Sequence, residues 1–126
     1  MKIPITGGTP TTLAPATFPF HMTIDATNVY WSDNGPVMKV PIAGGTPTTL
    51  VSYPVGTGVA RMIVSSGNLY YGINATATVG AFIMKVPVAG GTPTTVVSGV
   101  SSLGAMAVDA TAVYFGNGQS IMKVAK

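Results

Sequence analysis

Few side chains in this sequence could carry out acid–base or nucleophilic chemistry. The 126 residues contain three acidic groups, Asp25, Asp33 and Asp109, together with one histidine, His21, one arginine, Arg61, and no cysteine or glutamate. A hydrolase needs paired acids or a cluster of metal ligands at one site. Because Asp25 and Asp109 stand at turns, where a short acceptor caps backbone N–H groups, we interpret both as structural. We therefore expect a protein that is not an enzyme, with no catalytic residue, no metal and no cofactor.

The charge content narrows the classes of partner. Charged residues make up 7% of the chain, and the formal net charge of +3 comes from six basic groups against three acidic ones. Nucleic-acid binders gather Lys and Arg into a dense stripe, whereas four of the lysines here are spread one per repeat. No apolar run approaches the length that spans a bilayer. We expect neither a nucleic-acid nor a membrane partner, and the absence of cysteine leaves the compartment unknown.

The most regular feature of the sequence is a repeated segment. MKVPIAGGTPTTLVS at 38–52 returns as MKVPVAGGTPTTVVS at 84–98, MKIPITGGTPTTLAP opens the chain, and MKVAK closes it at 122–126. The spacing of these copies is close to the ~40 to 45 residues of a four-stranded propeller blade. The segments between them are short, rich in Val, Ile, Tyr and Thr, and separated by Gly, Asn, Asp and Pro. The sequence therefore predicts an all-β chain built from β-propeller blades.

Each repeat contains four strand-like segments, which we order from the propeller axis outward. The inner segments are 21–25, 61–65 and 105–109, and the second segments are 28–33, 68–73 and 112–117. The third segment is MKVP, and a Gly-Gly pair, whose free φ allows the reversal, leads to the outer segment TPTTLVS. The chain is thus predicted as the third and outer strands at 1–15, full repeats at about 21–52 and 61–98, and the first three strands at 105–126.

One repeat carries a signature that a known family shares. The run MTIDATNVYWSDNGPVMKVPIAGGTPTTL at 22–50 resembles the YWTD repeat of low-density-lipoprotein-receptor-type propellers and their bacterial relatives, with Tyr30, Trp31, Ser32 and Asp33 at the signature positions. The other copies read YYGI at 70–73 and YFGN at 114–117, so they lack the tryptophan and the acidic residue. The family builds six-bladed rings, and the resemblance therefore implies six blades.

The chain is predicted to be half of such a ring. Three blades cannot curve into a closed propeller, and an isolated half ring leaves apolar faces and unpaired strand edges in water. We expect a two-fold homodimer, six-bladed, in which each chain supplies the strand that the other lacks. The two ends then compete for one third-strand position, and the sequence leaves open whether 1–5 or 121–126 occupies it.

The connections that vary between repeats point to a binding surface. The links from second to third strand and from outer to inner strand differ in length and emerge on one face, whereas the opposite face repeats GGTPTT almost unchanged. Loops on a rigid scaffold carry function, so the variable face, which includes an insertion at 73–82, is the candidate site. The candidate ligand-binding residues are His21, Arg61, Phe20, Tyr53, Asp33 and Asn117.

Two of these candidates suggest a ligand class. His21 and Arg61 hold the same place in their repeats, near the expected tunnel mouth, where two copies of each could attract a small anion such as a carboxylate, a phosphate or an acidic sugar. The alternative is that both side chains only hydrogen-bond nearby carbonyl groups.

Three hypotheses on function follow. The leading one is a non-catalytic binding or scaffold module that self-assembles into a six-bladed homodimer and binds a small anionic or carbohydrate ligand. The second is an excised or engineered propeller fragment whose only property is self-assembly. The third is a cryptic propeller hydrolase.

Overall fold

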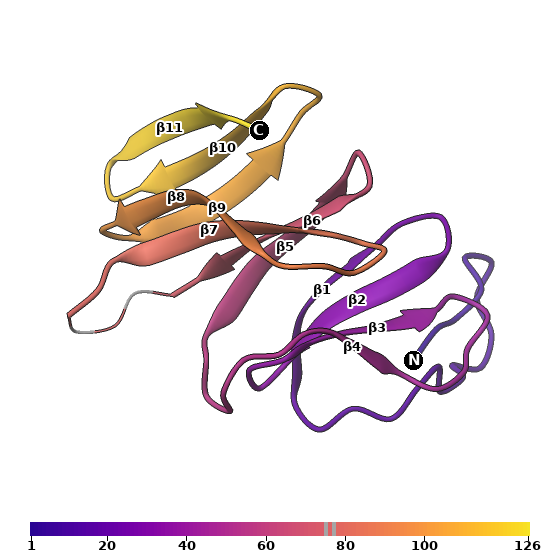
Figure 1. Ribbon diagram of the computed structural model, residues 1–126. Helices are drawn as coiled ribbons and strands as arrows, with labels where there is room; N and C mark the ends of the chain where they lie inside the picture. The colour runs from indigo at the N-terminus through magenta and orange to yellow at the C-terminus, as the bar shows by residue number, and fades with distance from the viewer. Residues whose placement is uncertain (75, 77) are drawn as a thin grey trace.

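The protein folds into antiparallel sheets, as seen in a computed structural model that describes residues 1–74, 76 and 78–126 (Figure 1). Within these residues there are three sheets, and the prediction of an all-β chain is confirmed. Sheet 1 consists of β1 (Pro19–Ile24), β2 (Asn28–Asp33), β3 (Val37–Pro41) and β4 (Thr48–Val51). Sheet 2 consists of β5 (Val59–Ser65), β6 (Asn68–Ile73), β7 (Ala81–Pro87) and β8 (Thr94–Val100). Sheet 3 consists of β9 (Leu103–Val108), β10 (Ala112–Asn117) and β11 (Ser120–Ala125).

Aspartates close the tight turns between first and second strands in sheets 1 and 3. Asp25 Oδ1 accepts the backbone N–H groups of Thr27 and Asn28, each at 2.7 Å, and its Oδ2 accepts the Tyr30 hydroxyl at 2.7 Å. Asp109 makes the equivalent contacts before β10. Burial disfavours the charged form of Asp25, but these hydrogen bonds outweigh it and lower its pKa to about 2. The prediction that these two aspartates cap turns is confirmed.

The core lies between successive sheets, which pack face to face. Tyr30 and Val37 of sheet 1 meet Leu69 and Tyr71 of sheet 2, and all four side chains are fully buried. On the opposite face of sheet 2, Tyr70, Ile83 and Val100 pack against Val113 and Phe115 of sheet 3. The two contacts use corresponding positions of the repeat, and β5 lies beside both β1 and β9. One sheet-to-sheet contact is therefore repeated along the chain.

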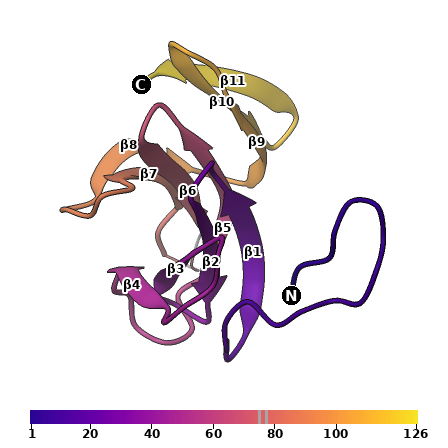
Figure 2. The same ribbon diagram turned by 90° about the vertical axis from the view of Figure 1, so that its right-hand side faces the viewer.

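The N-terminal segment differs from the predicted pair of strands at 1–15. The structure has one isolated antiparallel bridge there, between Lys2 and Thr11, and no longer ladder among the described residues. Figure 2 shows the segment on the far side of β1 from the other two sheets. Leu13 and Ala14 of this segment line a small cavity together with Trp31, which is only 4% exposed. The segment therefore covers part of the outer face of sheet 1.

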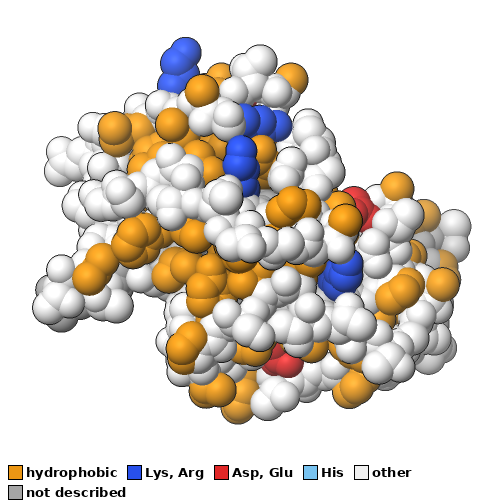
Figure 3. Space-filling model, in the orientation of Figure 1, with side chains coloured by type: hydrophobic (Ala, Val, Ile, Leu, Met, Phe, Trp, Pro, Cys, Tyr) orange, Lys and Arg blue, Asp and Glu red, His pale blue; other side chains and the backbone are white. Residues whose placement is uncertain are grey.

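The rest of that outer face is open. Met22 and Ile24 on β1 are 58% and 60% exposed, whereas Met62, at the position of Met22 in the next repeat, is 6% exposed. Figure 3 shows apolar side chains over much of the visible surface, with scattered charged groups. No helix in the described part of the chain is long and apolar enough to cross a membrane.

Candidate functional site

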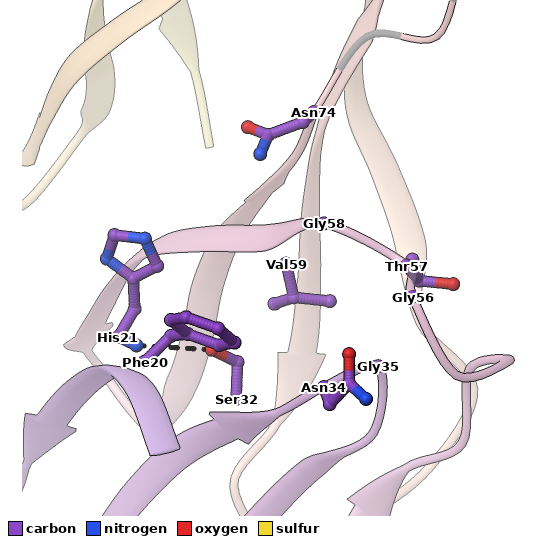
Figure 4. Close-up of a pocket in the computed structure, with 10 residues that line it drawn as sticks. All are labelled: Phe20, His21, Ser32, Asn34, Gly35, Gly56, Thr57, Gly58, Val59 and Asn74. Carbon is purple, nitrogen blue, oxygen red and sulfur yellow. Dashed lines mark hydrogen bonds between the residues drawn. The ribbon is translucent and has the colours of Figure 1, made fainter. Parts of the chain in front are cut away.

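A cavity of about 310 Å³ lies at one end of the contact between sheets 1 and 2 (Figure 4). Its volume is at the lower limit for small-molecule sites. Its lining comes from β1, β2, the β2–β3 turn, the link from β4 to β5, the first residue of β5 and the residue after β6. The lining residues are Phe20, His21, Ser32, Asn34, Gly35, Gly56, Thr57, Gly58, Val59 and Asn74. The cavity thus lies among the variable connections that the sequence singled out.

Sheet 1 forms one wall. An irregularity in the β1–β2 register lies between Pro19 and Met22, and it presents Phe20 and His21 at the cavity. The backbone N–H of His21 donates to Oγ of Ser32 at 3.2 Å, and Ser32 is buried. The ring of Phe20 stays 70% exposed, so an aromatic surface is available beside the imidazole.

The β2–β3 turn supplies the next part of the lining. Asn34 has φ of 57° and Gly35 has φ of 133°, which are left-handed values that favour Asn and Gly. A Cβ at Gly35 would overlap the carbonyl oxygen of Pro54. Only glycine allows the turn to approach the β4–β5 link this closely.

Sheet 2 forms the opposite wall. The Asn74 N–H donates to the Gly58 carbonyl at 2.9 Å, and a Cβ at Gly58 would lie 2.8 Å from the Asn74 side-chain nitrogen. In Figure 4 the amide of Asn74 projects toward the cavity from the side opposite Asn34, while the hydroxyl of Thr57 is directed away from His21. The polar side chains that line the cavity are therefore an imidazole, two amides and the hydroxyls of Ser32 and Thr57.

The structure does not bring Arg61 to this cavity. Arg61 lies on β5 with φ of 51°, and its Nε donates to the carbonyl of Gly104 at 2.7 Å, so its side chain links sheet 2 to sheet 3. This contact matches the alternative interpretation, in which the arginine hydrogen-bonds a nearby carbonyl. His21 and Arg61 occupy corresponding places in successive repeats, and of the two His21 lines this cavity.

Asp33 and Asn117 hold backbone in place. Asp33 accepts the N–H groups of Thr17, at 3.0 Å, and Phe18, at 2.5 Å. Asn117 Oδ1 accepts the Ser102 N–H at 3.2 Å in the corresponding place before β9. Asp33 and Asn117 therefore anchor the segments that lead into β1 and β9.

Tyr53 is also engaged within the chain. Its hydroxyl lies 2.9 Å from that of Tyr71, and the two rings meet edge to face with centroids 6.3 Å apart. Burial and then the hydrogen bond with Tyr53 raise the pKa of Tyr71 above its ordinary value. Of the six predicted ligand-binding residues, Phe20 and His21 line the cavity, and the other four make structural contacts.

Ser32, Asn34, Thr57 and Asn74 line the cavity but were not among the predicted ligand-binding residues. Length differences between repeats marked the connections that carry Thr57 and Asn74, but nothing in residue type distinguished these side chains from other loop residues. Residues 75 and 77 of the predicted insertion lie outside the described residues.

Over residues 1–74, 76 and 78–126, no group of three or more His, Cys, Asp or Glu side chains could hold a metal ion.

No protein-family model and no curated protein matches the chain.

Proposed function

We propose that the chain is half of a six-bladed β-propeller and that two copies close the ring as a non-catalytic binding or scaffold module. The repeated contact between sheets supports this proposal. Each sheet presents corresponding residues to the next one, and the inner strands β1, β5 and β9 follow one another around one side. Continuing the same contact in both directions gives a ring of sheets, as in propellers.

The observation that carries the proposal is the open face of sheet 1. Met22 is 58% exposed and Met62 is 6% exposed, although both occupy the same place in their repeats. The difference arises because the first two strands of a neighbouring sheet cover Met62 and are lacking at Met22. A second copy can supply them as its β9 and β10, since sheet 3 presents its other face, with Tyr114 and Ile121, as the next contact surface.

Hydrogen exchange across a range of protein concentrations tests this assembly. The outer edge of β11 pairs with nothing among the described residues, so the β11 amide hydrogens that point away from β10 should exchange rapidly in a monomer. We expect protection of β11 and β1 to increase with concentration, while the central strand β6 is protected throughout as the internal control. Rapid exchange of β11 at every concentration would contradict the proposal.

The cavity favours a carbohydrate as the ligand of this module. Sugars are bound by planar amide donors and acceptors beside an aromatic ring, and the cavity offers Asn34, Asn74 and His21 next to the exposed ring of Phe20. The arginine that would favour an anion is engaged with Gly104 in sheet 3.

Titration of isotope-labelled protein with neutral monosaccharides and with sugar acids, followed by NMR, tests the ligand class. We expect neutral sugars to shift the resonances of His21 and Asn74 at millimolar concentration and Asn74→Ala to abolish the shifts. Asn68→Ala is the matched control, because the Asn68 amide bonds the Ser66 carbonyl outside the cavity. Shifts produced only by sugar acids would favour the anionic alternative, and the absence of any shift would refute a carbohydrate site.

A further inference from the structure

The N-terminal segment has the same local fold as the outer hairpins of the two full repeats. Lys2 pairs with Thr11 just as Lys39 pairs with Thr48 and Lys85 with Thr94. The turns also agree, because the N–H of the first glycine donates to the proline carbonyl at 2.9, 2.8 and 2.9 Å in the three copies. Residues 2–11 are therefore a preformed third-and-outer-strand hairpin.

This hairpin also docks on sheet 1 as sheet 1 docks on sheet 2. The Lys39 ammonium donates to the carbonyl of Val88 at 2.8 Å, and the Lys2 ammonium donates to the carbonyl of Ile42 at 3.2 Å. Ile42 and Val88 follow the same proline in their repeats. Lys2 thus makes the contact that the third-strand lysine of a preceding sheet would make with sheet 1.

The chain holds another strand of the same kind in β11, whose Met122-Lys123-Val124 repeats the motif. β11 pairs with β10 through six residue pairs, from Ala112–Ala125 to Asn117–Ser120, whereas the N-terminal strand is held by one bridge. β11 still lacks an outer strand among the described residues, and Ile121 is 83% exposed. When two copies meet, β11 of one and residues 1–5 of the other require the same position.

The N-terminal strand fits that position poorly. Met1 is 85% exposed and Ile5 is completely exposed, so neither contributes buried apolar area. Beneath the segment, the Trp31 Nε1 is buried without a hydrogen-bond partner within the described residues, an arrangement that folded proteins usually avoid.

We propose that residues 1–5 are an intramolecular substitute for strand β11 of a second copy, and that assembly displaces them. The inference rests on the proposed dimer and adds which strand closes it. Thr11 and its neighbours leave Lys2 and pair with β11 of the partner, and the Lys123 ammonium of the partner replaces Lys2 at the Ile42 carbonyl. The N-terminal strand is then a competitor of dimerisation within each chain.

A reversible crosslink in the full chain tests the displacement. Lys2→Cys with Thr11→Cys places two thiols on a directly paired position, where the Cα separation of about 5.5 Å suits a disulfide. Because the chain has no other cysteine, the oxidised and reduced forms of this one variant differ only in whether positions 2 and 11 can separate. Since locking removes the binding-competent form, oxidation should raise the apparent dimer dissociation constant at least about tenfold.

The matched variant, Thr11→Cys with Lys123→Cys, should form a covalent dimer on oxidation, because the two positions pair only between chains. Circular dichroism of both variants checks that they fold. If the wild type dimerises and the oxidised Lys2–Thr11 variant dimerises equally well, β11 is the displaced strand and the inference is wrong, while the proposed ring stands. If neither the wild type nor any reduced variant dimerises, both the ring and the inference fail.

Discussion

Truncating Met22 should weaken the dimer while leaving the single chain almost unaffected. In the monomer, Met22 is 58% exposed, and in the assembled ring it should resemble Met62, which is 6% exposed. Closure of the proposed ring would therefore bury about half of the side chain. Full burial of a methionine side chain is worth about 1.5–3 kcal/mol, so Met22→Ala should lose about 1 kcal/mol at each contact.

A two-fold dimer has two such contacts, so the total loss is about 2 kcal/mol, or about a thirtyfold increase in the dimer dissociation constant. Sedimentation equilibrium measures the constant, and urea unfolding at low concentration measures the stability of the chain. The control is Met62→Ala, which should lower the free energy of unfolding by about 2–5 kcal/mol, because its cavity lies within one chain. Dissociation constants for Met22→Ala and wild type that agree within about threefold would refute the assignment of this face.

Three further predictions concern the single chain. The pKa of Asp25 is about 2 in the folded protein and 3.8 ordinarily. The stability that its carboxylate provides is therefore present above about pH 4 and lost as the pH falls toward 2. Urea unfolding at several pH values should show a weaker acid dependence for Asp25→Asn than for the wild type. Gly35→Ala should lower the free energy of unfolding by about 2 kcal/mol or more. The control Gly45→Ala should lower it by less, because Gly45 has φ of 139° but open space at its Cβ. Equal melting temperatures of the two variants would contradict the close approach at Gly35. Arg61→Met should cost about 1–2 kcal/mol in chemical unfolding through loss of the bond to Gly104, and a neutral effect would count against that contact.

The strand positions could be predicted from the sequence because the same pattern of strand and turn residues recurs from one repeat to the next. The segments 28–33, 68–73 and 112–117 are β2, β6 and β10 with the predicted bounds. Four aromatic side chains of these strands are buried between sheets, namely Tyr30, Tyr70, Tyr71 and Phe115, whereas Trp31 is buried on the outer face of sheet 1 and Tyr114 is more exposed. The extent of pairing in the N-terminal segment could not be predicted in this way, because its sequence matches a strand pair while the structure forms one bridge there, between Lys2 and Thr11.

The candidate site was harder to predict, because its side chains are selected by geometry rather than by type. Arg61 and His21 stand at the same repeat position, yet Arg61 has a left-handed φ and reaches Gly104, whereas His21 remains at the cavity. Asn74 becomes a lining residue only because Gly58 leaves space for its amide. Such close approaches depend on how two sheets meet, which residue spacing within one repeat does not specify.

The mass of the protein in solution tests closure of the ring by two copies most directly. Light scattering on the eluting peak of a size-exclusion column should give twice the chain mass of 12.7 kDa, with dissociation on dilution. A compact species of 12.7 kDa that unfolds cooperatively at every accessible concentration would contradict it.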